Sequence, residues 1–276
     1  PTRRSSDLAT TGPELIQRAI LAFKLPDLAP CSDLEALEAA LPPSGDPAQR
    51  ERAAEVRRRI DEAHTLRDAG MIQQGMAVAI AARTEAALLE DPLLLAEALE
   101  CLGRLQAEST HTAAAVGTLA DAVLEAERIS ADHVAARAWL SMLYALTMEH
   151  DLPTARARVL AAQAAVERTG DDELRAWWLN NVGILEGEAK DHERADERLR
   201  QALELKSRIY GAGHVDVGIT WINLGSLRLQ ANDLTGAAEA YDHAQVIFEA
   251  TVSAAHPLSA YVESGRCRVD WQLGNH

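Results

Sequence analysis

Residues Trp221–Gln245 read WINLGSLRLQANDLTGAAEAYDHAQ, and this stretch decides how the whole chain is interpreted. Two runs of periodically spaced apolar residues flank the pair Asn232-Asp233, which is typical of a turn. Small residues, Gly225 in the first run and Ala237 and Ala244 in the second, are placed where two helices can approach closely. The stretch therefore predicts a helix (helix A), a tight turn and a second helix (helix B) packed against the first.

The same arrangement recurs along the chain at steps of 40 to 42 residues, each copy centred on a marker residue in the turn. After each of the first five markers, the residues five and twelve positions later are small, as close packing of helix B requires. The markers are Gly70, Thr110, His150, Lys190, Asn232 and Gly274; the small residues are Gly75, Ala115, Ala155, Ala195, Ala237 and Ala82, Ala122, Ala162, Ala202, Ala244.

This repetition predicts an all-α fold, a right-handed α-solenoid of antiparallel helix pairs with five full repeats and one half repeat. Asp91-Pro92 and His256-Pro257 are start signals for two A helices, because proline suits the first helical turn. The expected solenoid spans 49–276, with repeats at 49–90, 91–129, 130–169, 170–212, 213–254 and a partial one at 255–276.

Composition agrees with helices and argues against several function classes. Only 4% of the 276 residues are aromatic and 25% are charged, with 27 basic against 42 acidic residues and a formal net charge of −15. The electrostatic field of this net negative charge repels DNA and RNA, so we expect no nucleic-acid partner. No apolar run is long enough for a membrane span and no signal peptide opens the sequence, which favours a cytoplasmic location. Three distant cysteines are expected to be reduced thiols.

The repeat resembles the tetratricopeptide repeat (TPR). The family's small-residue trio falls on Gly225, Ala237 and Ala244, and its aromatic residue in helix B falls on Tyr241. The usual repeat has about 34 residues, so the longer step here resembles the subclass typified by kinesin light chains, although Val215 stands where that pattern has proline. The family's large residue early in helix A falls on Leu99, Trp139, Leu179 and Trp221.

The sequence before the repeats has a resemblance of its own. Residues 25–70, from LPDLAPC to the Arg-rich run before Gly70, are similar to the stretch that introduces the repeats in bacterial serine/threonine protein kinases with C-terminal TPRs. We expect 9–48 to form a helical lead-in and a Pro-rich link. Residues 1–8, PTRRSSDL, match the translation of a sequencing-adapter oligonucleotide, with a disordered tail as the alternative, and we expect the natural chain to continue beyond both ends.

No catalytic signature is found in the sequence. The sequence contains none of the glycine-rich, catalytic and metal-binding loops of a kinase. It also lacks the phosphate-binding motif GxxxxGK[ST], the hydrolase motif GxSxG and the zinc-protease motif HExxH. In YGAGHVDVG, Asp216 occupies the last glycine position of a dinucleotide loop, so we interpret Gly211 to Asp216 as a joint between repeats, with His214 and His256 as helix caps. His111, His150 and His192 fall at successive turns, too far apart to share a metal ion. We predict no catalytic residues, no metal and no cofactor.

The TPR resemblance implies a non-catalytic scaffold that binds a peptide or partner protein in a groove lined by A helices. The positions six, nine, ten and thirteen before each marker should face that groove. The expected groove residues are Arg104, Arg137, Ser141, Tyr144, Trp177, Asn180, Asn181, Asn223 and Ser226, with Leu140, Ile184 and Ile222 beside them. Asn181 and Asn223 share one register, which suits an extended peptide backbone; bonding to the neighbouring helix is the alternative. Only Arg104 and Arg137 fit the family's carboxylate clamp, which disfavours a C-terminal carboxylate ligand.

Two other functions stay open at the level of sequence. The chain fits the regulatory or substrate-recruiting region of a serine/threonine kinase, and it also fits a regulator that binds a small molecule or signal peptide in the same groove. The sequence names neither the partner nor the oligomeric state.

Overall fold

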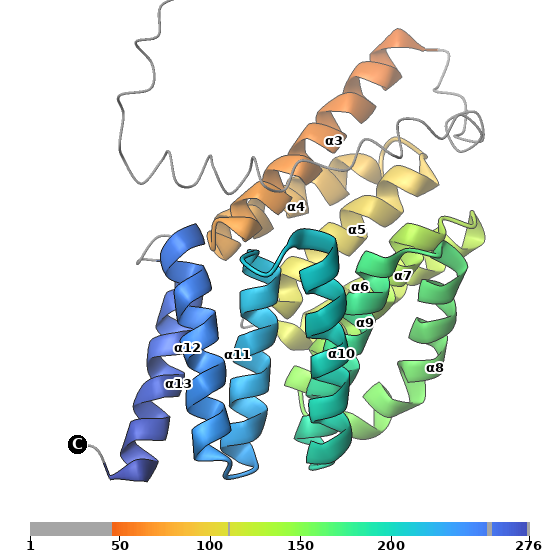
Figure 1. Ribbon diagram of the computed structural model, residues 1–276. Coiled ribbons are helices and arrows are strands. Elements are labelled where there is room, and N and C mark those ends of the chain that lie inside the picture. The colour runs from red at the N-terminus through yellow and green to blue at the C-terminus, as the bar shows by residue number, and fades with distance from the viewer. Residues whose placement is uncertain (1–45, 110, 253–255, 275–276) are drawn as a thin grey trace, which may run out of the picture.

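The computed structural model describes residues 46–109, 111–252 and 256–274, and these residues form eleven α-helices and no strand (Figure 1). The A helices are α3 (Pro47–Asp68), α5 (Pro92–Ala107), α7 (Asp132–Met148), α9 (Asp172–Glu188), α11 (Val215–Gln230) and α13 (Pro257–Leu273). The B helices are α4 (Ile72–Ala86), α6 (Thr112–Arg128), α8 (Leu152–Thr169), α10 (His192–Tyr210) and α12 (Leu234–Thr251). The predicted all-α solenoid is confirmed.

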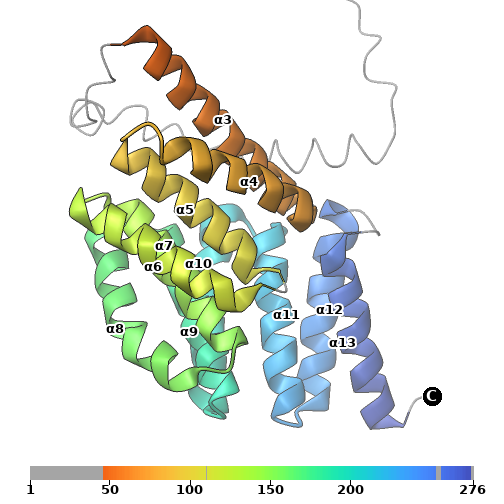
Figure 2. The ribbon, with the colours of Figure 1, turned by 180° about the vertical axis from the view of Figure 1, so that it is seen from behind.

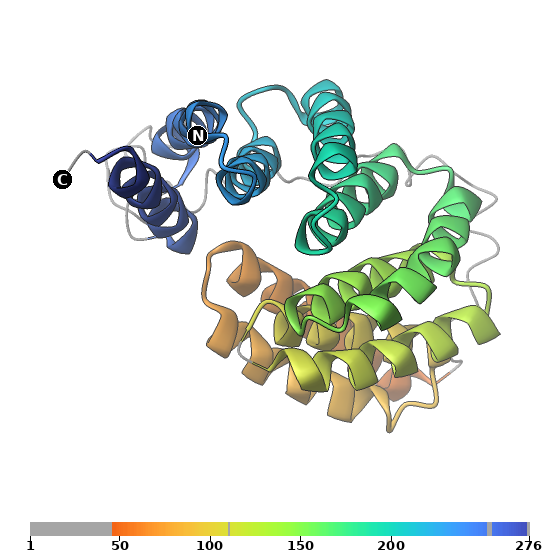
Figure 3. The ribbon, with the colours of Figure 1, turned by 90° about the horizontal axis from the view of Figure 1, so that it is seen from below.

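Helices that follow one another in the sequence also pack side by side. Each A helix packs on the next B helix and on the A helix of the following repeat, while the main contacts of every B helix are with A helices. The A helices therefore form a continuous layer, and the pairs follow a curved path when viewed along the helices (Figure 3). The view from behind shows the same succession, with α13 next to the end of α3 (Figure 2).

A left-handed backbone residue follows every A helix whose marker position the structure describes. Gly70, His150, Lys190, Asn232 and Gly274 have φ between 58° and 80°; Thr110 lies outside the described residues. At the third marker, the His150 N–H donates to the Thr147 carbonyl and the Asp151 N–H to the Leu146 carbonyl, both at 3.0 Å. This bonding pattern satisfies the last carbonyls of the helix and turns the chain sharply into helix B.

Side chains cap the first turn of most helices. Asp151 accepts from the Thr154 N–H at 3.3 Å, and Asp233 accepts from the Gly236 N–H at 3.0 Å. At the starts of α11 and α13 the cap is a histidine: His214 accepts from the Asp216 N–H and His256 from the Leu258 N–H, both at 3.2 Å. The interpretation of these histidines as structural caps is confirmed.

Small residues allow the two helices of a repeat to approach closely. The alanines at the repeated positions are fully buried. A Cβ added to Gly103 would lie 2.5 Å from Leu119 Cγ, and one added to Gly183 would lie 2.9 Å from Leu199 Cγ. Because side chains of this size would have to shift, the glycines fix the spacing between helices A and B.

Some expectations fall on parts of the chain that the structure does not describe. Residues 1–8, nearly all of the 9–48 lead-in, and Cys31 lie outside the described ranges. Cys101 is buried and Cys267 is exposed, and both are free thiols. Across 46–109, 111–252 and 256–274, no helix combines the length and apolarity needed to cross a membrane.

Candidate inner binding face

The surface made by the A helices on the inside of the curve, called the inner face below, is where the sequence places its candidate residues (Figure 3). All nine lie on A helices: α5, α7, α9 and α11. They differ in exposure. Arg104, Arg137, Tyr144, Trp177, Asn223 and Ser226 are partly exposed, whereas Ser141, Asn180 and Asn181 are buried.

The buried asparagines belong to the helix packing. Asn181 is 3% exposed, and its side-chain amide donates to the Leu140 carbonyl on the preceding A helix at 2.8 Å. Asn223 donates to Asn180 Oδ1 at 2.9 Å, again one A helix back. For Asn181 the alternative of bonding to the neighbouring helix therefore holds, and its amide does not face a ligand.

A hydrogen-bonded chain extends this contact across three helices. Lys206 of α10, 8% exposed, donates to Thr220 Oγ1 at 3.0 Å. The Thr220 hydroxyl lies 3.4 Å from Asn180 Oδ1, and the Asn180 amide donates to Asn181 Oδ1 at 3.3 Å. Since buried polar groups need partners, this chain fixes how α9, α10 and α11 sit together.

Charged residues gather on the inner face near α3, α5 and α7. Arg104 Nε lies 3.3 Å from Glu108 Oε1, and Arg67 Nη2 lies 2.6 Å from Asp68 Oδ1. Burial lowers the pKa of Arg104. Burial also opposes ionisation of Arg67, but Glu108 and Asp68 outweigh it and raise the pKa of that guanidinium. These arginines already have carboxylate partners within the chain.

Glu100 is the most deeply buried member of this group. Its side chain is 1% exposed, and Oε2 lies 3.6 Å from Arg137 Nε. Burial alone would raise the pKa of Glu100, but Arg137 and Arg104, helped by His64 and Arg67, lower it, so the carboxylate is ionised.

Several buried polar atoms around Glu100 have no hydrogen-bond partner among the described residues. They are both Glu100 carboxylate oxygens, Arg137 Nε, Arg67 Nη1 and Ser141 Oγ. Underbonded groups of this kind are uncommon in folded proteins, and each costs free energy. Of these groups, Glu100 and Arg137 are held by their ion pair.

Side chains from distant repeats interact across the inner face. The Arg104 guanidinium of α5 stacks 4.2 Å from the ring centre of Trp177 of α9, two repeats further along. Burial raises the pKa of Tyr144 to about 12, and Glu108 and Tyr261 of α13 contribute to this shift. Tyr261 itself is 66% exposed. The curve is therefore tight enough for side chains to interact across it.

The sequence-based prediction missed Arg67, Glu100, Glu108 and Tyr261. For two of them, Glu100 and Tyr261, the sequence did contain the identifying pattern. Glu100 stands ten residues before the second marker and Tyr261 thirteen before the sixth, the register positions applied to the middle repeats. Extending the register to every repeat would have placed both on the inner face.

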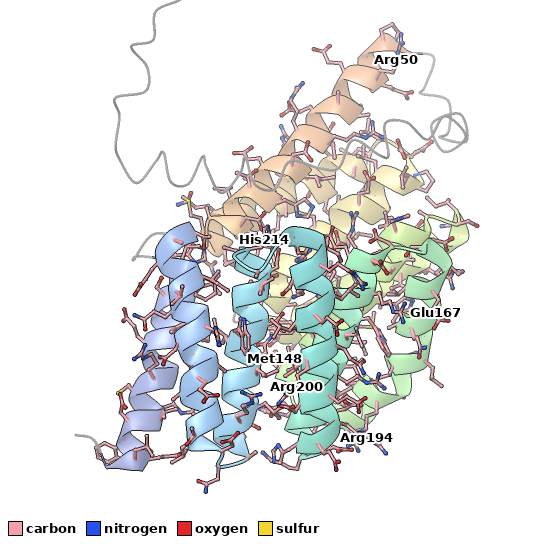
Figure 4. The ribbon with its side chains drawn as sticks, viewed as in Figure 1. Arg50, Met148, Glu167, Arg194, Arg200 and His214 are labelled. Atoms are coloured by element: carbon pink, nitrogen blue, oxygen red, sulfur yellow. The ribbon has the colours of Figure 1, made fainter. Side chains whose placement is uncertain are left out.

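A depression separate from the residues predicted above lies between α10 and α12, over α11. It has a volume of about 280 Å³ and is lined by Arg200, Trp221, Arg228 and His243 among others; Figure 4 shows Arg200 on α10 facing this region. The His243 ring stacks on Trp221 with centroids 4.4 Å apart. Arg200 and Arg228 share the carboxylate of Asp196, so both cations of this depression already have an ionic partner.

The histidines at the turns do not come together. His150 Nδ1 lies 3.7 Å from Glu188 Oε2, a single contact on the surface. Among the described residues, no group of three or more His, Cys, Asp or Glu side chains has the arrangement of a metal site.

Comparison with known proteins gives the fold and no more. No protein-family pattern matches the chain, and no curated protein matches it by sequence. Among solved structures, the chain resembles a Rap protein complexed with Competence and Sporulation Factor, with 15% identity, a TM-score of 0.70 and coverage of 94% of this chain and 69% of that one. It also resembles BtubC (BKLC) from P. vanneervenii, with 18% identity, a TM-score of 0.55 and coverage of 83% and 86%. At these identities the likeness concerns architecture, and it agrees with the helices in describing an α-solenoid of TPR-like repeats.

Proposed function

We propose that this chain is a non-catalytic scaffold that binds a peptide or partner protein on its inner face, in the service of signalling. The observation that carries the proposal is the stacking of Arg104 of α5 on Trp177 of α9, with the partly exposed Arg137 and Tyr144 on the A helix between them. Aromatic and arginine side chains of this kind supply most of the free energy of protein interfaces. The Rap neighbour, solved in complex with Competence and Sporulation Factor, supports the same use of the fold.

Asn223 is the asparagine that remains suited to a ligand. It is partly exposed, and it uses its amide nitrogen for Asn180. No described residue donates to its amide oxygen, which can therefore accept a hydrogen bond from a peptide N–H. The inner-face contacts that we propose for a partner are Arg137, Tyr144, Trp177, Asn223, Ser226 and Tyr261. Arg104 acts by supporting Trp177, while Ser141, Asn180 and Asn181 serve the packing beneath.

Selection of peptides from a random display library on the immobilised chain tests this proposal. Trp177→Ala and Tyr261→Ala should each weaken binding of a selected peptide by about 30-fold, as truncation of a central aromatic residue does. Leu160→Ala, on the B helix α8 where Leu160 is 76% exposed, is the matched control and should leave affinity unchanged. Binding that depends on Leu160 but is indifferent to both aromatic variants would rule out the inner face.

A second candidate is that the chain is the regulatory or substrate-recruiting region of a serine/threonine kinase. The sequence of residues 25–70 favours it through its similarity to the stretch that introduces the repeats in such kinases. The genomic sequence upstream tests this directly. A glycine-rich loop and an HRD motif within a few hundred codons would support the kinase, and an in-frame start codon close to residue 1 would exclude it.

A further inference from the structure

The first and last described repeats touch, although 188 residues separate the groups involved. His256 Nε2, at the start of α13, lies 3.3 Å from the Asp68 carbonyl oxygen at the end of α3. A Cβ added to Gly70 would lie 2.7 Å from Pro257 Cδ and 3.1 Å from Pro257 Cγ. The two views of Figures 1 and 2 agree in placing the start of α13 beside the end of α3.

The geometry of His256 makes this contact a directed hydrogen bond. Its Nδ1 accepts from the Leu258 N–H at 3.2 Å, so the proton of the neutral ring is on Nε2. The Nε2–H then donates to the Asp68 carbonyl. One ring thus caps α13 and holds α3. The equivalent residue one repeat earlier, His214, also caps its helix, but its ring stacks on Tyr210 with centroids 4.6 Å apart.

Gly70 supplies the space for the contact. The same marker position carries Asn232 in the fifth repeat, with φ of 63° against 74° at Gly70, so the left-handed turn by itself accepts asparagine. What distinguishes Gly70 is Pro257, which occupies the place of its missing side chain.

We propose that His256 and Pro257 form a latch against Asp68 and Gly70, which closes the solenoid end to end and limits access to the inner face. The stacking of Arg104 of α5 on Trp177 of α9 across the curve belongs to the closed form. A state held by a few contacts is suited to opening for a partner. This last step rests on the proposed function; the closure itself does not.

Matched variants isolate the latch from the helix ends. Gly70→Asn keeps a residue that tolerates the left-handed turn and adds only the clash with Pro257, whereas Gly170→Asn, where φ is 63° and no atom lies within 4 Å of the added Cβ, is its control. His256→Ser keeps a good helix cap and loses the Asp68 contact, and His214→Ser is its control.

Two measurements without any ligand test the closure. Small-angle X-ray scattering should show a larger radius of gyration for Gly70→Asn and His256→Ser than for the two controls, with helicity by circular dichroism unchanged. Hydroxyl-radical footprinting should show labelling of Tyr144 and Trp177 rising by about fivefold, the effect of losing roughly 1 kcal/mol, while the buried Tyr241 stays protected.

Radii and labelling equal to those of the controls would overturn the latch. Association of the peptide selected on the immobilised chain then distinguishes closure by the latch from binding on the inner face. Faster association with the two latch variants than with their controls supports gating by the latch. If the variants open but association is unchanged, the latch does not regulate the inner face. If Trp177→Ala fails to weaken binding while the variants open, the closure stands and the proposed function fails.

Discussion

Lys190 adopts a left-handed backbone with φ of 67°, as do His150 and Asn232 at the equivalent turns. Non-glycine residues pay about 1–2 kcal/mol for this conformation. The turn tolerates them because the bonds from the Lys190 and Asp191 N–H groups, at 2.9 Å each, satisfy the last carbonyls of α9. At the scale of single residues, the backbone hydrogen bonds therefore determine the turn between helices A and B, even where the marker is not glycine.

Lys190→Gly should raise the free energy of unfolding by about 0.5–1 kcal/mol, since relief of the left-handed strain exceeds the added flexibility of the unfolded chain. Urea denaturation measures the change. Lys190→Ala retains a Cβ and should show no gain. If the glycine variant proves no more stable than the alanine variant, strain at this turn is negligible.

His64, half-buried on α3, gives stability a dependence on pH. Burial lowers its pKa from 6.5 to about 4, so the unfolded chain binds a proton at a higher pH than the folded chain does. Its contribution is fully present above pH 6.5 and is lost as the pH falls toward 4. Lowering the pH from 7.5 to 5 should cost about 2 kcal/mol through this residue.

His64→Leu should remove that part of the difference between unfolding free energies measured at pH 7.5 and pH 5. His133→Leu is the control, because the His133 side chain is 62% exposed. Comparing each variant with itself at two pH values cancels any change in packing. An unaltered pH difference in the His64 variant would show that His64 is not the group responsible.

At the scale of helices, local chemistry and packing have separate roles. Caps such as Asp151 and Asp233 define where each helix begins, while close glycine contacts define how far apart two helices lie. Gly103 of α5 abuts Leu119 of α6, whereas Gly117 on the same α6 has no atom within 4 Å of an added Cβ. Substitution of Gly103 therefore tests the packing between α5 and α6, whereas substitution of Gly117 tests the helix propensity of α6 alone.

Gly103→Ala should destabilise the chain by about 1–3 kcal/mol through overpacking. Gly117→Ala should stabilise it by about 0.5–1 kcal/mol, because alanine is the better helix former and meets no neighbour. Thermal unfolding followed by circular dichroism gives both signs in one experiment. Changes of the same sign would mean that the A–B spacing in this repeat is not set by Gly103.

At the scale of the whole molecule, the solenoid departs from a simple linear array. In such an array each repeat contacts only its neighbours. Here His256 and Pro257 of the last described helix contact Asp68 and Gly70 of the first. The first and last described repeats are therefore joined. A change in the contacts of α13 should alter the stability of the end of α3.

Removal of residues 256–276 tests this coupling by hydrogen exchange. Amides in the last turn of α3, near Asp68, should exchange about fivefold faster, since they lose a contact worth roughly 1 kcal/mol. Amides of α8, in the middle of the chain, should exchange as before. Faster exchange confined to α11 and α12 would indicate an open array in which the ends act independently.

Much of the architecture was accessible from the sequence because its causes are local. The marker residues, the small residues after them and the histidine caps act within a few residues of their own position, so their spacing predicted helix A, turn and helix B. The roles of the asparagines were not accessible in this way. Whether Asn181 faces a ligand or the Leu140 carbonyl depends on how two A helices rotate against each other.

The sequence by itself determined the repeat, its step of 40 to 42 residues and the positions of the turns. Only the tertiary structure decided which side chains are buried between repeats, that Arg104 reaches Trp177 two repeats away, and that His256 returns to Asp68. The physical reason is that each repeat adds a small rotation, which is fixed by the packing of its helices. Whether the first and last repeats meet depends on the sum of these rotations. A local sequence pattern does not contain that sum.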